Sequence, residues 1–178
     1  MSRTRIWWYR GVLLVLMAAV MAFILVQSGK NGDASEGISL SVTRFLVRLT
    51  HPHLEDAAPA DFAAVVDAWH GAVRKLAHMA EFGALCFLAS LFLFTYPLRR
   101  WAAGLCALGY SAVFAACDEL HQLTVPGRGA SVRDVLIDTA GAALGLALAA
   151  LLLWLVQKIR RRQAQADGTE KAPRADNK

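Results

Sequence analysis

Four long apolar runs constrain the fold of this chain more than any other feature of its sequence. They cover approximately residues 11–27, 76–96, 101–120 and 135–157. Runs of this length can cross the hydrocarbon core of a bilayer as helices. A soluble domain would instead alternate apolar and polar positions, and 56% apolar residues with only 19% charged ones is unusual for one. The pattern predicts an all-α membrane protein with four transmembrane helices.

The first run has two interpretations. A cleaved signal peptide has the same order of basic, apolar and small residues, and Val26-Gln27-Ser28 would serve as a cleavage site. The apolar region is long for a signal peptide, however, and the preceding aromatic group Ile6-Trp7-Trp8-Tyr9 suits the headgroup layer of a membrane. We therefore expect this run to be retained as a span.

Basic residues near the span ends predict the orientation. The link Pro97-Leu98-Arg99-Arg100 is so short that the second and third spans must be antiparallel neighbours. With alternating spans, one side carries Arg3, Arg5, Arg10, Arg99, Arg100, Lys158, Arg160, Arg161 and Arg162. On the other side, the basic residues close to the helix ends are Arg74, Lys75, Arg128 and Arg133. Because basic residues near spans favour the cytoplasm, both termini are expected to be cytoplasmic. Residues 28–74 and 121–133 then face outward, into the extracytoplasmic space.

The net charge of +5 does not indicate nucleic acid as a partner, because membrane orientation already explains the basic residues. The cysteines Cys86, Cys106 and Cys117 all lie in apolar runs without a CxxC spacing, which argues against a disulfide framework or a zinc ribbon. We expect no cofactor and no metal, and membrane lipids as the main partners.

The outer segment, residues 28–74, has apolar residues at helical spacing in two places. They are Ile38, Val42, Phe45, Leu46 and Leu49, then Phe62, Val65, Val66, Trp69 and Val73. This spacing predicts one or two short interfacial helices. His51 and His53 lie in the turn between them, but two loop histidines without a third partner do not predict a metal site.

The end of the chain differs from the rest in composition. After the fourth run and its basic cluster, the residues are polar and lack helical apolar spacing. We therefore expect a disordered cytoplasmic tail at 161–178 and a single membrane domain over 1–160.

Polar residues gather at the outer ends of three spans. On the second, Arg74, His78 and Glu81 fall within an arc of about 60°, with Lys75 adjacent. The third ends in a polar cluster of Asp118, Glu119, His121 and Gln122. The fourth begins with Asp134 and Asp138 on a stripe that continues into Gly141 and Gly145, where small residues would admit another helix.

Alternating spans bring these clusters to one leaflet, where buried charges are costly and imply a role. The cluster could be a salt-bridge network that aligns the helices, or a cavity with a function. In a cavity, His78, Glu81, Asp118 and Glu119 are the acid–base candidates. The ligand-binding candidates are Lys75, Gln122, Arg128, Asp134 and Asp138. A divalent cation at His78 and the carboxylates is less favoured, because cysteines and a second suitable histidine are missing.

In order along the chain, these motifs resemble the VanZ-like family. The segments concerned are Arg74-Lys75-Leu76-Ala77-His78-Met79-Ala80-Glu81-Phe82, Asp118-Glu119-Leu120-His121-Gln122, Pro126-Gly127-Arg128, and Asp134-Val135-Leu136-Ile137-Asp138-Thr139-Ala140-Gly141 with Gly145. The resemblance extends over the whole membrane region. It departs from the family at Asp138, where many relatives have Asn.

The resemblance implies a bacterial envelope protein of the kind associated with resistance to the lipid-bearing glycopeptide teicoplanin more than to vancomycin. Two hypotheses follow from the residues and the resemblance together. In the first, the outward cavity binds a lipid-bearing or anionic envelope ligand without catalysis. In the second, a small membrane enzyme modifies an envelope lipid or glycan head group by carboxylate and histidine acid–base chemistry. An ion pathway is the least favoured, because the ionisable residues stop near one face.

Overall fold

The computed structural model describes residues 3–29, 32–54 and 58–170. These residues are helical throughout, with no strand among them. The elements are α1 (Arg3–Ser28), α2 (Gly32–Thr50), the short 3-10 helix η1 (Pro52–Leu54), α3 (Pro59–Leu93), α4 (Arg100–Gln122) and α5 (Val132–Glu170). The all-α prediction is confirmed.

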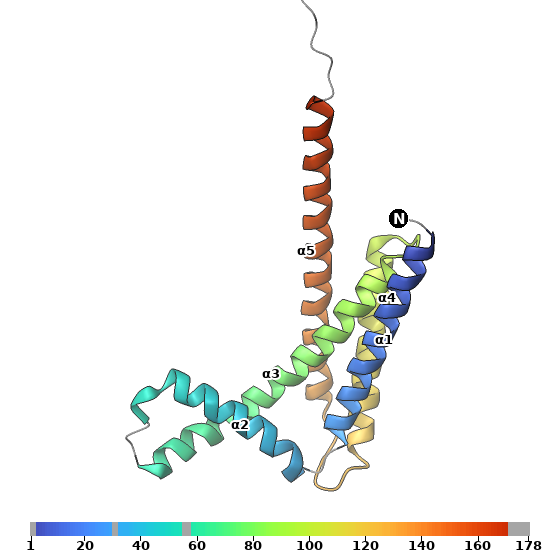
Figure 1. Cartoon of the computed structure of the whole chain (residues 1–178). Coiled ribbons are helices and arrows are strands. Elements are labelled where there is room, and N and C mark those ends of the chain that lie inside the picture. Colours follow the sequence, from blue (N-terminus) through green and yellow to red (C-terminus); the bar gives the residue numbers. More distant parts are fainter. Residues whose placement is uncertain (1–2, 30–31, 55–57, 171–178) are drawn as a thin grey trace, which may run out of the picture.

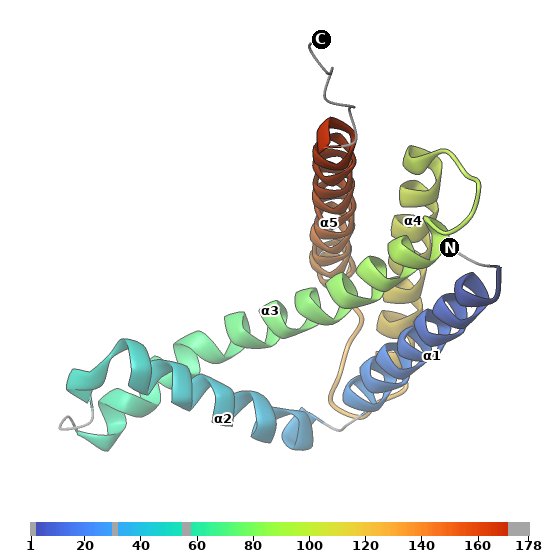
Figure 2. The same ribbon diagram turned by 45° about the horizontal axis from the view of Figure 1, so that its top comes forward.

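Helix α3 is the centre of the arrangement, because it packs against α1, α2, α4 and α5. Its C-terminal half lies with α1 and α4 in a bundle, and its middle crosses α5 (Figures 1 and 2). Its N-terminal half leaves the bundle together with α2, and we call α2 and this half of α3 the arm. The second half of α5 rises clear of the other helices (Figure 1).

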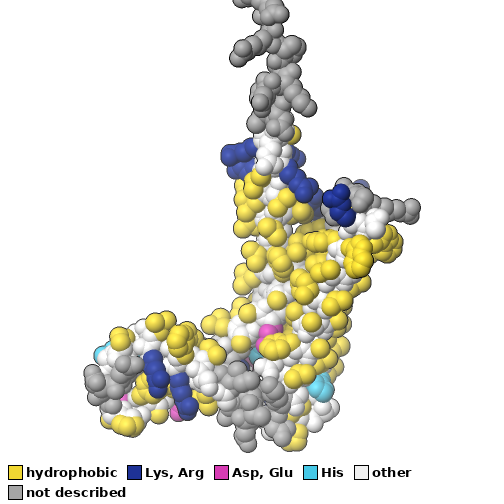
Figure 3. Space-filling view, in the orientation of Figure 1, with side chains coloured by type: hydrophobic (Ala, Val, Ile, Leu, Met, Phe, Trp, Pro, Cys, Tyr) yellow, Lys and Arg dark blue, Asp and Glu magenta, His cyan; other side chains and the backbone are white. Residues whose placement is uncertain are grey.

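Four of the helices, α1, α3, α4 and α5, are long and apolar enough to cross a membrane, among the residues that the structure describes. This confirms the four predicted spans. Figure 3 shows apolar side chains over most of the visible bundle surface and lysine and arginine side chains near one end of it. Such a surface suits lipid rather than water.

Two helices extend beyond their predicted ends. The second amphipathic segment is not a separate short helix, because α3 runs from Pro59 without interruption into the second span. No proline lies between Pro59 and Pro97, so nothing in the sequence stops the helix. Helix α5 continues over residues 161–170, where we expected a disordered tail. Its arginine, glutamine and alanine residues there are good helix formers, and residues 171–178 lie outside the described residues.

The contact between α3 and α5 depends on glycine. A Cβ atom at Gly141 would fall on the backbone of Met79, and one at Gly145 on the backbone carbonyl of Gly83. A Cβ atom at Gly83 would in turn lie 3.1 Å from the Gly141 carbonyl oxygen. The predicted close approach at the glycine stripe is therefore confirmed, and it places the first turns of α5 directly against the middle of α3.

Arg10 joins α1 to the connection between α3 and α4. Its Nε donates to Thr95 Oγ1 at 2.8 Å and its Nη2 to the Thr95 carbonyl oxygen at 2.9 Å. The guanidinium also lies over the Tyr96 ring, 3.8 Å from its centroid. At the other end of α1, Ile24 and Ser28 are completely buried in the bundle. Helix α1 is thus attached at both ends, and its C-terminal end contributes to the polar site described next.

Candidate functional site

The predicted polar residues gather around one cavity. The helix segments that carry them meet at one end of the bundle, where the arm begins (Figure 1). The C-terminal ends of α1 and α4, the start of α5 and the middle of α3 all lie there. The loop from α4 to α5 turns at Gly127, whose φ of 80° is in the left-handed region that favours glycine. This tight turn reverses the direction of the chain, so that α5 begins beside the end of α4.

A buried hydrogen-bond network links α1 to α4. Ser28 Oγ donates to Asp118 Oδ2 at 2.6 Å, and Gln122 Nε2 donates to the same oxygen at 3.1 Å. Asp118 is 1% exposed, and its other oxygen, Oδ1, is buried without a hydrogen-bond partner among the described residues. Since buried polar atoms are normally paired, this oxygen marks a position for a proton donor.

Glu119 joins α4 to the start of α5. Its Oε2 accepts a hydrogen bond of 2.8 Å from the backbone N–H of Ser131, immediately before α5. The first N–H groups of a helix have no partner within the helix, so a carboxylate there stabilises it. Although Glu119 is only 5% exposed, it therefore has a structural hydrogen bond.

Two ion pairs account for four of the charged residues. Lys75 Nζ lies 3.6 Å from Asp134 Oδ1 and joins α3 to α5, with both side chains about one third exposed. His78 Nδ1 lies 3.2 Å from Glu81 Oε2, one turn further along α3. Each pair places a cationic or ionisable group beside a carboxylate, although the contacting atoms His78 Nδ1 and Glu81 Oε2 are not aligned for a hydrogen bond.

A small cavity of about 30 Å³ lies between these groups. Its lining residues are Arg74, Lys75, His78, Glu119, Gln122, Arg128, Asp134, Ile137 and Asp138. Asp138 is 4% exposed and forms no hydrogen bond or ion pair with any described residue. The Nε and Nη2 atoms of Arg128 are likewise buried without an acceptor among the described residues. The cavity thus contains one acid, Asp138, and two cations, Arg74 and Arg128, without a hydrogen bond or ion pair to a described residue, in a space for one or two water-sized groups.

Arg128 is electrostatically unusual for a loop residue. Burial and the neighbouring Arg74 lower the pKa of its guanidinium from the ordinary value. Arginine stays protonated even so, because its pKa starts so high. Asp118 and Glu119 lie near enough to offset part of this effect, but neither accepts a hydrogen bond from the buried Nε and Nη2 atoms. A partly desolvated guanidinium with unpaired donors favours a bound anion, and its planar fork suits a phosphate or a carboxylate.

The structure brings together most of the residues that the sequence singles out. Lys75, His78, Glu119, Gln122, Arg128, Asp134 and Asp138 line the cavity. Glu81 and Asp118 do not line it, but they contact His78 and Gln122, which do. Sequence reasoning missed the roles of Ser28 and the Ser131 N–H. The position of Ser28 at the outer end of the first span was the available signal.

No three His, Cys, Asp or Glu side chains lie close enough to hold a metal ion in the part of the chain that the structure describes. A serine and a histidine that the sequence did not pair meet in the arm, where Ser39 Oγ and His70 Nε2 are 2.6 Å apart. His70 donates no hydrogen bond to a carboxylate among the described residues, so this contact lacks the third member of a catalytic triad. It holds α2 against α3.

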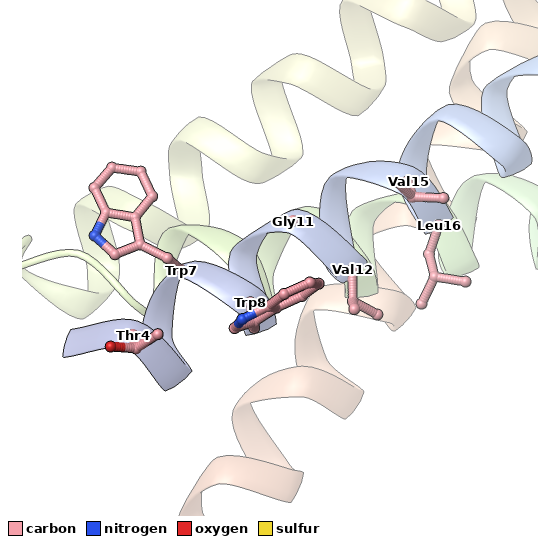
Figure 4. Close-up of a pocket in the computed structure, with 7 residues that line it drawn as sticks. All are labelled: Thr4, Trp7, Trp8, Gly11, Val12, Val15 and Leu16. Atoms are coloured by element: carbon pink, nitrogen blue, oxygen red, sulfur yellow. The ribbon is translucent and has the colours of Figure 1, made fainter. Parts of the chain in front are cut away.

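A larger hollow lies away from the polar site. It has a volume of about 750 Å³ and is formed along α1 alone. Figure 4 shows its lining side chains, among them Trp7, Trp8 and Val12, all projecting from this one helix. The hollow has an apolar lining, with Trp8 75% exposed, and belongs to the surface that meets lipid.

Together these observations define a small helical multi-pass membrane protein with a charged cavity at one end of its bundle. The sequence model of the VanZ/LLP1 family matches residues 13–154, which include all of the cavity residues. The chain belongs to this family. No curated protein and no solved structure matches it.

Proposed function

We propose that this VanZ-like protein acts in the bacterial cell envelope by binding the polar head group of a lipid-bearing molecule in the cavity beside Arg128. The observation that carries the proposal is the pair of buried Arg128 nitrogens without an acceptor, in a cavity that Arg74 and Lys75 also line. Glu119, Asp134 and Asp138 also line the cavity, but Glu119 and Asp134 have partners within the protein. The cations without an ion pair to a described residue, Arg74 and Arg128, favour an anionic group. Binding at the membrane surface would lower susceptibility to lipoglycopeptides such as teicoplanin, by limiting their access to cell-wall precursors.

The dimensions of the cavity support head-group binding in preference to enclosure of a whole lipid. About 30 Å³ accommodates a small polar group and no acyl chain. The acyl chains of a ligand would remain in the bilayer, against apolar side chains such as Leu76 and Leu144, which are more than half exposed. The protein would then hold a lipid by its head alone.

Orientation is the second part of the proposal. We place the protein in the cytoplasmic membrane with both termini in the cytoplasm and the cavity outside, according to the distribution of lysine and arginine. The arm would lie along the outer interface. Its exposed Val42, Phe45 and Leu49 would face the acyl region, and Arg44 and Arg48 the head groups.

Reporter fusions test this orientation. Green fluorescent protein fused after Lys178 is expected to fluoresce, because it folds in the cytoplasm. Alkaline phosphatase inserted between Leu54 and Ala58 is expected to be active, because that connection would be extracytoplasmic. The opposite pattern, a dark fusion at the C-terminus with an inactive phosphatase, would contradict the orientation.

The glycopeptide susceptibility of cells that express the protein tests the proposed function. In a glycopeptide-sensitive Gram-positive host, the wild type is expected to raise the teicoplanin concentration needed to stop growth. This increase should be several-fold larger than the increase in the vancomycin concentration needed. Arg128→Gln is expected to remove the effect, because glutamine keeps hydrogen-bond donors but loses the charge. The measurement is growth at equal membrane levels, and Arg162→Gln, which changes an exposed arginine on the second half of α5, is the matched control. Equal protection by wild type and Arg128→Gln would exclude the cavity as the functional site.

A further inference from the structure

The charged side chains around the cavity indicate more about its ligand than that it has an anionic group. Lys75 is paired with Asp134, His78 with Glu81, and Glu119 with the Ser131 N–H. The side chains that line the cavity without a hydrogen bond or ion pair to a described residue are the acid Asp138 and the cations Arg74 and Arg128. A ligand with only negative charge would satisfy the cations and leave the buried acid alone.

From this we infer that the ligand is zwitterionic, with a primary ammonium group at Asp138 and a phosphate at Arg128 and Arg74. The inference rests on the proposed function, because it names the head group of the lipid-bearing ligand. Phosphoethanolamine lipids have this chemistry.

The acid and the cations of the site differ in how far their side chains are exposed. Asp138 is 4% exposed and lies one helical turn after Asp134, whereas Arg74 belongs to the exposed residues of α3. The acid therefore forms the inner wall of the cavity and the cation its rim. A compact ammonium group can enter to the carboxylate, while the bulkier phosphate lies nearer the rim, between the exposed Arg74 and the buried nitrogens of Arg128.

The volume of the cavity selects among ammonium groups. A primary ammonium is close in size to a water molecule, so it fits within about 30 Å³. Three methyl groups, as in choline, would need more space and would have no aromatic cage, since the lining residues include no Phe, Tyr or Trp. The site should therefore prefer ethanolamine to choline, and it should prefer both charges to the phosphate alone.

Lipid retention by the purified full-length protein in detergent tests this inference. The probes are dioleoyl phosphatidylethanolamine, phosphatidylcholine and phosphatidylglycerol, which share their acyl chains, and the readout is the lipid adduct in native mass spectrometry. We expect the wild type to retain phosphatidylethanolamine about tenfold more than either of the others, since one charge-assisted contact of about 1.4 kcal/mol corresponds to that ratio. This comparison requires no variant to fold.

Two substitutions test which residue binds the ammonium group and which binds the phosphate. Asp138→Asn should reduce phosphatidylethanolamine to the level of phosphatidylglycerol, and Arg128→Gln should weaken both lipids. Asp67→Asn, exposed in the arm, and Arg162→Gln, exposed on the second half of α5, are the matched controls and should resemble the wild type.

The outcomes separate this inference from the proposed function. Equal retention of phosphatidylethanolamine and phosphatidylcholine by the wild type would overturn the selection for a primary ammonium. Retention of phosphatidylglycerol equal to or above that of phosphatidylethanolamine would overturn the zwitterionic ligand but leave the binding of an anionic head group intact. Retention of none of the three above the Arg128→Gln level would contradict the proposed function as well.

Discussion

Gly145→Ala is expected to lower the free energy of unfolding by about 2 kcal/mol or more, although it adds only one methyl group. The new Cβ atom would overlap the backbone carbonyl of Gly83, and neither backbone has a flexible side chain that could move away. Helices α3 and α5 would have to separate, which would break the contact that positions Asp138 and Asp134 against α3. The measurement is thermal unfolding in detergent, followed by tryptophan fluorescence.

Gly109→Ala is the matched control, because it makes the same change within α4 where a Cβ atom meets nothing within 4 Å. Alanine has the higher helix propensity, so this variant should be as stable as the wild type or slightly more so. If Gly145→Ala unfolded at the same temperature as Gly109→Ala, the close packing of α3 on α5 would be wrong. We expect Gly141→Ala to behave like Gly145→Ala, since its Cβ atom would meet the backbone of Met79.

Asp118→Ala is the second substitution with a large expected effect on stability, about 2–4 kcal/mol. Asp118 Oδ2 accepts hydrogen bonds from both Ser28 and Gln122, in a site where all three side chains are buried. Alanine removes the acceptor and leaves two buried donors, each of which costs about 1–3 kcal/mol when unsatisfied. The same unfolding experiment in detergent measures this decrease in stability.

Two comparisons separate hydrogen bonding from charge at Asp118. Asp118→Asn retains an acceptor oxygen for Ser28 and Gln122, so it should be less destabilising than Asp118→Ala. Asp67→Ala removes an exposed carboxylate from α3 and should change the stability little. The network between α1 and α4 would be unsupported if Asp118→Ala were no worse than Asp67→Ala.

The stability and ligand experiments together distinguish the two interpretations of the polar cluster. Asp118 and Glu119 have hydrogen bonds that join elements, so substitutions there should affect folding. Arg128 and Asp138 form no side-chain hydrogen bond or ion pair with the described residues, so their loss should affect ligand binding while the protein still folds. A network that only aligned helices would have no reason to leave these two charges unpaired.

The sequence by itself determined the number of spans, their antiparallel order and the gathering of the polar residues at one end. Each depends on local properties, namely the length of an apolar run, the shortness of the link at Pro97-Leu98-Arg99-Arg100 and the helical period. The glycine stripe could also be recognised from the sequence, since small residues at four-residue spacing identify a face that another helix can approach. Such signals do not require knowledge of how the helices are rotated.

The tertiary structure decided which charges are paired and which are free. Whether Asp134 or Asp138 meets Lys75 depends on the rotation of α5 and on its crossing of α3, and differences of a few ångströms exchange one partner for another. The same holds for Ser28, which reaches Asp118 only because α1 ends beside α4. Packing of backbones at Gly83 and Gly145 sets these positions, and packing between distant segments is not encoded in any local pattern.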